Sequence, residues 1–192
     1  AMLERGTRLT RGRGNESLGE LVIVSAVSGE AEETVISDKQ WSLMHPELSP
    51  DGRWLAYTRR PVGGGRREDA RVLLRPYPGT GGDQMVFGDR ATCPAWNPNG
   101  RELFFLAYDP YRMMAVDVED GRLGRPHELF TFDFERLPLA ASPFRAFDVS
   151  PDGQRFYAVE NLPETVPEKI TRINIITNWF EELKAKVGEG RQ

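Results

Sequence analysis

Cysteine and histidine are scarce in this sequence. Its 192 residues include one cysteine, Cys93, and two histidines, His45 and His127. A single cysteine excludes an internal disulfide framework. A zinc site made of cysteine and histidine needs more ligands than these three residues supply, and they lie far apart in the chain. We therefore expect neither a metal site nor a cofactor.

Sequence signatures of common enzymes are also missing. The chain has no Gly-x-Ser-x-Gly nucleophile elbow, which argues against a serine hydrolase. It has no Gly-rich phosphate loop, no His-Arg-Asp and no Asp-Phe-Gly, so it contains no protein kinase domain. On this inventory we predict that the chain is not an enzyme.

Charge of one sign and long apolar runs are lacking as well. The net charge is -4, from 25 basic and 29 acidic residues, which is not the clustered basic surface that a nucleic acid needs. The four arginines near the start stand in a Gly-rich stretch with few apolar residues, so we expect a solvated arm; they are Arg5, Arg8, Arg11 and Arg13. No apolar run approaches the roughly 20 residues of a membrane-spanning helix.

A four-residue phrase recurs three times, at steps of 48 and 53 residues. Each copy suits a tight turn: Ser or Asn accepts a local hydrogen bond, Pro presets φ, Asp or Asn fits the third position, and Gly adopts the left-handed conformation. The copies are Ser49-Pro50-Asp51-Gly52, Asn97-Pro98-Asn99-Gly100 and Ser150-Pro151-Asp152-Gly153. We interpret these residues as structural turns.

Short apolar runs flank each turn and predict antiparallel hairpins. A third strand follows each hairpin, at 70–75, 112–118 and 170–176, and a fourth follows two of them, at 84–87 and 127–132. Four antiparallel strands every 40 to 50 residues or so is the period of a β-propeller blade. The sequence therefore predicts an all-β fold, a partial β-propeller of about four blades of four-stranded antiparallel sheets.

The two ends depart from the repeat. At the start, only the third and fourth strands of a blade are predicted, at 20–26 and 33–36. At the end, apolar residues recur at helical spacing after an N-cap at Asn178. We predict a single domain over 1–192. Its parts are a partial blade (1–40), two blades (41–90 and 91–139), a partial blade (140–177) and a short terminal helix (178–187).

The turns and their surroundings resemble TolB-like, WD-type bacterial propellers with PD40 repeats. In that family a proline stands upstream of the turn, as Pro46 and Pro94 do here, while Phe147 replaces it in the third copy. The runs Arg75–Gly79, Met113–Asp117 and Asn178–Lys184 more narrowly resemble the C-terminal propeller of bacterial proteins that carry a serine/threonine kinase domain upstream. The resemblance covers roughly residues 45 to 187 and implies a periplasmic or other extracytoplasmic location.

For function, the sequence favours a non-catalytic propeller module that binds a protein or peptide as part of a larger bacterial protein. The candidates to face a central channel are His45, Glu47 and Asp148. Two loops, at 59–69 and 134–143, are expected to be solvated connections, with partner binding as the alternative. A second candidate function is the non-catalytic propeller portion of a prolyl-peptidase-like hydrolase.

Paired carboxylates leave a more remote alternative open, a fragment of a propeller glycosidase. Glu47 and Asp148 are the best-placed acids, although each can equally pair with Arg53, Arg101 or Arg155.

The unmatched ends raise a question of assembly. An incomplete first and last sheet would expose apolar residues between blades, such as Leu21, Ile23, Ile173 and Ile175. A homodimer could cover these faces, or the terminal helix could cap them in a monomer.

Overall fold

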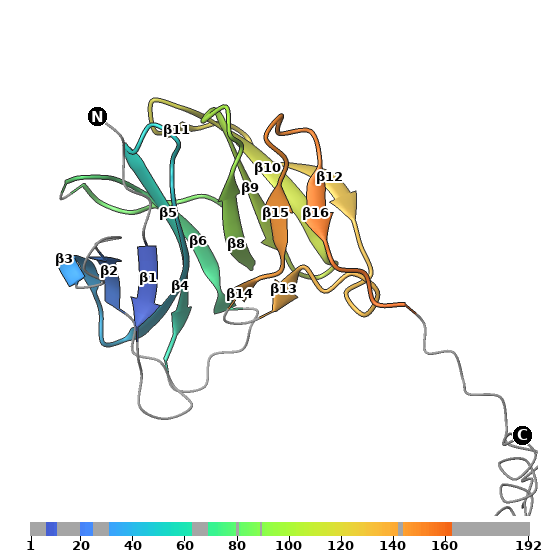
Figure 1. The fold of residues 1–192 in the computed structure, drawn as a ribbon, viewed down its shortest axis with the longest axis horizontal. Helices are drawn as coiled ribbons and strands as arrows, with labels where there is room; N and C mark the ends of the chain where they lie inside the picture. The colour runs from blue at the N-terminus through green and yellow to red at the C-terminus, as the bar shows by residue number, and fades with distance from the viewer. Residues whose placement is uncertain are drawn as a thin grey trace, which may run out of the picture. The chain divides into compact units, whose positions relative to one another are not determined.

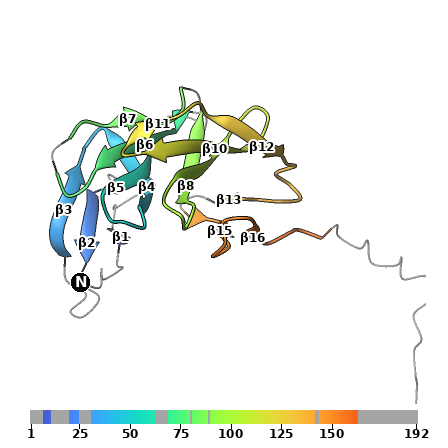
Figure 2. The same ribbon diagram turned by 90° about the horizontal axis from the view of Figure 1, so that it is seen from above.

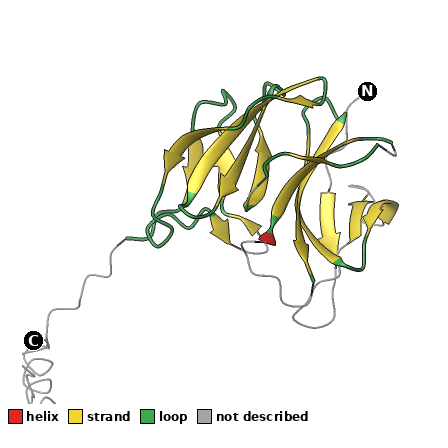
Figure 3. Cartoon of the chain, turned by 180° about the vertical axis from the view of Figure 1, so that it is seen from behind, coloured by secondary structure: helices red, strands yellow, loops and turns green. Residues whose placement is uncertain are grey.

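The computed structural model describes residues 7–10, 20–24, 31–62, 69–79, 81–88, 90–141 and 144–162. Nearly all of these residues are strand or loop (Figure 3). The chain is all-β, as predicted, and its antiparallel sheets form a partial β-propeller that does not close into a ring in the described part. Within the same ranges, no helix has the length and apolar character needed to cross a bilayer.

The chain divides into two units, residues 1–161 and 162–192. All sheets described below belong to the first unit. The predicted strand at 170–176 and the predicted helix at 178–187 lie outside the described residues.

The first sheet has three strands, in the order β1-β2-β3 (Figure 1). They are β1 (Thr7–Thr10), β2 (Glu20–Val24) and β3 (Ala31–Ser37). Of the four arginines expected in a solvated arm, Arg8 lies in β1, which pairs antiparallel with β2, and the other three lie outside the described residues. The unpaired edge of β2 offers a full row of backbone partners, which outweighs the low apolar content of this segment.

The second sheet has four strands, in the order β4-β5-β6-β7. They are β4 (Trp41–Leu48), β5 (Trp54–Pro61), β6 (Arg71–Pro76) and β7 (Gln84–Met85). The third sheet repeats this pattern with β8 (Ala91–Trp96), β9 (Glu102–Ala107) and β10 (Arg112–Glu119). Two outer strands, β11 (Arg122–Leu123) and β12 (His127–Thr131), both pair with β10.

Two short hairpins follow the third sheet. The first joins β13 (Ala140–Ala141) to β14 (Phe144–Arg145), and the second joins β15 (Phe147–Val149) to β16 (Phe156–Ala158). The region 134–143, which includes β13, was expected to be a solvated loop. Instead Leu139 is buried, and Phe134 and Leu137 pack against the same apolar cluster, because the hairpins cover the open face of the third sheet.

The inner strands follow one another across the sheets. Seen from above, β4, β8 and β15 come in succession on the inner side of the described sheets (Figure 2). Contacts between β4 and β8, and between β8 and β15, confirm that the first strand of each repeat lies next to the first strand of the following one.

Three apolar clusters fill the spaces between successive sheets. Leu21 of the first sheet packs with Leu43 and Tyr57 of the second, so it does not contribute to an open face. Val72 and Leu74 of the second sheet pack with Phe105 of the third. The last cluster joins the third sheet to the short hairpins. Each cluster therefore depends on two neighbouring sheets.

The three repeated turns share one hydrogen-bond pattern. In the first, the Gly52 N–H donates to the Ser49 carbonyl at 2.8 Å, and Gly52 has a φ of 73°. The Ser49 hydroxyl donates to Asp51 Oδ1 at 2.6 Å and accepts from the Trp54 N–H at 2.9 Å. The turns at Asn97 and Ser150 make the corresponding turn-closing bond, at 2.8 Å in both cases. The residue types of the phrase thus act locally, as the sequence predicts.

The turns also pack on one another across the sheets. A Cβ atom on Gly100 would lie 3.7 Å from the ring of Pro50, and one on Gly153 would lie 2.2 Å from the side-chain oxygen of Asn97. Each glycine therefore supplies a left-handed φ and, at Gly153, space for the preceding turn as well.

Acid should weaken the fold through two of these turns. Hydrogen bonds from Ser49 and from the Arg53 side chain and backbone lower the pKa of Asp51 from 3.8 to about 2. The Ser150 hydroxyl and the Gln154 N–H do the same for Asp152. Because the folded pKa lies below the unfolded one, these bonds stabilise the fold fully above pH ~4, and we expect the stabilisation to be lost between pH ~4 and ~2. Urea unfolding at several pH values in this window measures it.

A matched variant isolates the two carboxylates. The double substitution D51N/D152N should flatten the pH dependence between pH ~4 and ~2, since asparagine does not titrate there. The turn at Asn97 already carries Asn99 in this position, so the amide is compatible with the turn. An unchanged slope in the double variant would mean that other acids cause the acid sensitivity.

Candidate ligand-binding site

Matching bulges interrupt the inner strands β4 and β8. In β4, the pairing with β5 shifts by one residue between Met44 and Glu47, and in β8 the pairing with β9 shifts between Thr92 and Ala95. His45 and Cys93 occupy the bulges, each just before a proline, with φ of 51° and 54°. A left-handed conformation at a non-glycine residue carries a strain that the surrounding structure must offset.

The two bulges are joined through Thr58 of β5. The Cys93 N–H donates to Thr58 Oγ1 at 3.1 Å, and the same oxygen lies 3.2 Å from Nδ1 of His45. Because Thr58 Oγ1 accepts from Cys93, its own proton is available to Nδ1 of a neutral His45. The Cys93 sulfur lies 3.7 and 3.8 Å from the two ring nitrogens of His45. Residues 48 positions apart thus meet side by side.

Burial governs the chemistry of the Cys93 thiol. The side chain is fully buried, and desolvation raises the pKa of the thiol from 9.0 to about 12. The Thr92 hydroxyl, which lies 3.7 Å from the sulfur, and the nearby charge of Arg145 only partly oppose this rise. Cys93 is therefore protonated at neutral pH and is a poor nucleophile.

A small cavity opens beside the bulges. Its volume is about 20 Å³, slightly above the roughly 10–15 Å³ that one water molecule requires. The lining comes from both blades and from β13, and consists of Met44, His45, Arg60, Ala70, Thr92, Cys93, Tyr108 and Ala140. The cavity offers hydroxyl, imidazole and guanidinium groups, but its lining includes no carboxylate.

Arg145 makes a second polar cluster on the inner strands. Its guanidinium pairs with Glu47 at 3.1 Å and with Asp148 at 3.5 Å. It also donates to the carbonyl of Pro94 at 3.0 Å and to that of Phe147 at 3.1 Å. Arg145 thereby connects the second sheet, the third sheet and the β15–β16 hairpin.

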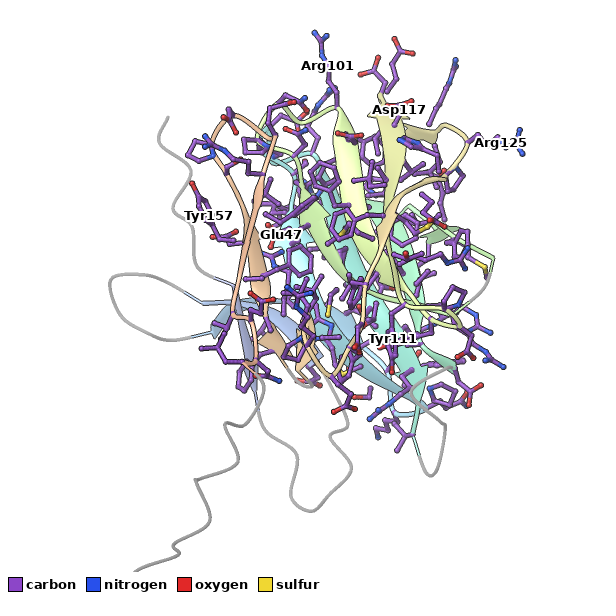
Figure 4. All side chains as sticks on the ribbon, turned by 90° about the vertical axis from the view of Figure 1, so that its right-hand side faces the viewer. Glu47, Arg101, Tyr111, Asp117, Arg125 and Tyr157 are labelled. Carbon is purple, nitrogen blue, oxygen red and sulfur yellow. The ribbon has the colours of Figure 1, made fainter. Side chains whose placement is uncertain are left out.

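The predicted partners of the two acids were wrong. The arginines named from the sequence lie elsewhere: Arg53 and Arg155 pair with turn aspartates, and Arg101 projects from the turn end of the sheets (Figure 4). Glu47 instead lies beside the hairpin that carries Tyr157, because the adjacent β14 places Arg145 there (Figure 4). Sequence separation gave no indication of this contact.

The sequence-based candidates are thus distributed over two places on the inner strands. His45 lines the cavity, whereas Glu47 and Asp148 belong to the Arg145 cluster. His127 lies on the outer strand β12, away from both. Sequence reasoning missed Thr92 and Cys93, and it placed Arg60 in a loop at 59–69, whereas Arg60 belongs to β5. The repeat could have indicated Cys93, because it precedes Pro94 as His45 precedes Pro46.

No group of three or more metal-ligating side chains is found in the described ranges. His45 and Cys93 do lie together, but the thiol of Cys93 is protonated at neutral pH.

Comparisons with known proteins give structural likenesses only. Neither a protein-family model nor a curated protein matches the sequence. Similar solved structures include a hydrazine synthase from Kuenenia stuttgartiensis (16% identity, 74% of this chain and 49% of that chain, TM-score 0.47). A second is the periplasmic gluconolactonase of Pseudomonas aeruginosa (18% identity, 80% of this chain and 46% of that chain, TM-score 0.46). A third is a puromycin-hydrolyzing peptidase of Mycobacterium tuberculosis (15% identity, 67% of this chain and 24% of that chain, TM-score 0.42).

The prediction that this chain is not an enzyme is contradicted by these neighbours, since all three are enzymes by name. That prediction relied mainly on missing contiguous motifs, whereas a site assembled from separate strands of a propeller needs none. The chain spans about half or less of each neighbour's length, and at these TM-scores the likenesses assign no reaction to it. They do not distinguish TolB-like or PD40 propellers from others.

Proposed function

We propose that this chain is a ligand-binding part of a β-propeller, and that the ligand enters the cavity between the bulged strands β4 and β8. The observation that carries this proposal is the pair of matching bulges. They hold His45 and Cys93 in a strained conformation, side by side in the lining of one cavity. Backbone strain retained at two equivalent positions is typical of a functional site.

The composition of the lining supports the same proposal. Binding sites combine apolar walls with a few polar groups that fix orientation. Here Met44 and Ala140 provide apolar surface, while Arg60, Thr92 and His45 provide polar groups. The small volume restricts the bound part of the ligand to a group of a few atoms, so the rest of the ligand lies outside the cavity.

A fragment screen by NMR tests the proposal. We expect small polar fragments to shift the backbone amide signals of His45, Thr92, Cys93 and Tyr108 together and in a saturable way. The variant Ala140→Leu, which fills the cavity, should abolish these shifts while it retains the dispersed spectrum of the folded chain. If every fragment that binds shifts only signals remote from the cavity, or binds Ala140→Leu equally well, the proposed site is wrong.

A further inference from the structure

We propose that the group received by this cavity is a single carboxylate, bound by the guanidinium of Arg60. This inference rests on the proposed function, because it names the chemistry of the ligand at the same site. It follows from the charge of the lining, from the environment of Arg60 compared with that of similar arginines, and from the size of the cavity.

Arg60 is the one lining residue that carries a permanent charge. No ion pair connects it to a carboxylate in the described part of the chain, and its Nε is buried there without a hydrogen-bond partner. A buried donor on a charged group is costly when it stays unsatisfied. A bound anion would supply an acceptor for the guanidinium and the opposite charge together.

Comparable arginines have a charged or aromatic partner, whereas Arg60 has none of either kind among the described residues. The same kind of buried, unpartnered Nε occurs in Arg59, Arg75 and Arg112. Arg75 lies 3.8 Å from Asp83, Arg112 lies 3.9 Å from Glu128, and Arg59 stacks over the ring of Trp41 at 4.3 Å. Among the described residues, Arg60 is the one of these four that makes neither an ion pair with a carboxylate nor a cation–π contact, and it lines the cavity.

The neighbouring hydroxyl groups are suited to an acceptor. Thr92 Oγ1 lies 3.5 Å from Thr58 Oγ1 and 3.7 Å from the Cys93 sulfur, both at the long end of hydrogen-bond distance. A carboxylate oxygen is a stronger acceptor than either, so Thr92 can donate to it at little cost. Arg60 and Thr92 come from different blades, which makes the site dependent on their packing.

The volume favours a carboxylate over larger anionic groups. About 20 Å³ is little more than the space that one water molecule requires, so the cavity favours the smallest anionic groups, of which a carboxylate is one. Phosphate and sulfonate groups present three or more oxygens. Two sources offer a carboxylate of this kind, namely a small organic acid and the C-terminus of a peptide.

Acetate and its neutral isostere acetamide are the probes for the test. We expect acetate, and not acetamide, to shift the amide signals of His45, Thr92, Cys93 and Tyr108. Arg60→Gln should weaken acetate binding at least about tenfold, because it removes a charge-assisted hydrogen bond. Arg60→Lys should restore part of the affinity. Arg59→Gln is the matched control and should leave acetate binding unchanged, since the adjacent residue of the strand faces the opposite side.

Further measurements distinguish the two sources of the carboxylate and show which results would contradict the proposal. An acetylated dipeptide with a free C-terminus that binds more tightly than acetate identifies a peptide as the source, whereas equal binding identifies a small acid. If acetamide binds as well as acetate, or if Arg60→Gln has no effect, the carboxylate assignment is wrong while the cavity remains a binding site. If no fragment of any charge reaches the cavity, the proposed function fails as well.

Discussion

Phe105→Ala should cost about 3–5 kcal/mol of the free energy of unfolding, the range measured when a buried aromatic side chain is truncated. Phe105 is fully buried in the cluster between the second and third sheets, and its ring lies 5.5 Å from that of Phe87. The substitution removes the ring from the contact that holds two sheets together. Urea or thermal unfolding, followed by circular dichroism, measures the loss.

Phe144→Ala is the matched control for this prediction. Its side chain is 72% exposed, so the same chemical change should alter stability by less than about 0.5 kcal/mol. Equal losses in the two variants would show that the second and third sheets do not pack as described. A large loss in Phe144→Ala alone would mean that its exposed ring is covered by residues outside the described ranges.

Gly121→Ala is expected to destabilise the fold by about 2–4 kcal/mol, through backbone strain and a steric clash combined. Gly121 lies in the tight turn between β10 and β11 with a φ of 76°. A Cβ atom there would come within 1.9 Å of the ring of Trp54, which belongs to the second sheet. The ring or the turn would have to move, and either movement disturbs the contact between the two sheets.

Gly88→Ala provides the control for the second substitution. A Cβ atom on Gly88 meets no other atom within 4 Å, and its φ lies outside the left-handed region, so we expect a change within about 0.5 kcal/mol. The double variant Trp54→Phe/Gly121→Ala separates the two causes of the loss, namely the steric clash with Trp54 and the backbone strain. If the smaller ring restores most of the stability, the clash dominates, and if it restores none, the backbone strain dominates.

The structure links the fold to the proposed site through the gaps between blades. Arg60 and Thr58 come from β5, whereas Thr92 and Cys93 come from β8, so the cavity exists only while these strands are adjacent. Variants that loosen the sheet contact, such as Phe105→Ala, should therefore weaken ligand binding as well as stability. Arg60→Gln, by contrast, should act on binding alone.

Local features were the ones that could be predicted from the sequence. The hairpins around Ser49, Asn97 and Ser150 depend on turn chemistry within four residues, and the apolar runs that flank them are directly readable. Predictions that depended on neighbours distant in sequence were less successful. Arg8 was expected in an arm without regular structure but lies in a strand, and Leu139 was expected in an exposed loop but is buried.

The sequence by itself determined the repeat, the antiparallel hairpins and the all-β class, because turn propensity and strand patterning act between residues that are close along the chain. Only the tertiary structure decided which side chains meet. It brought His45 to Cys93, Glu47 to Arg145, and Arg60 to a cavity without a carboxylate. These contacts follow from the packing of one blade on the next and from a one-residue bulge in each inner strand, and no local pattern in the sequence specifies either of them.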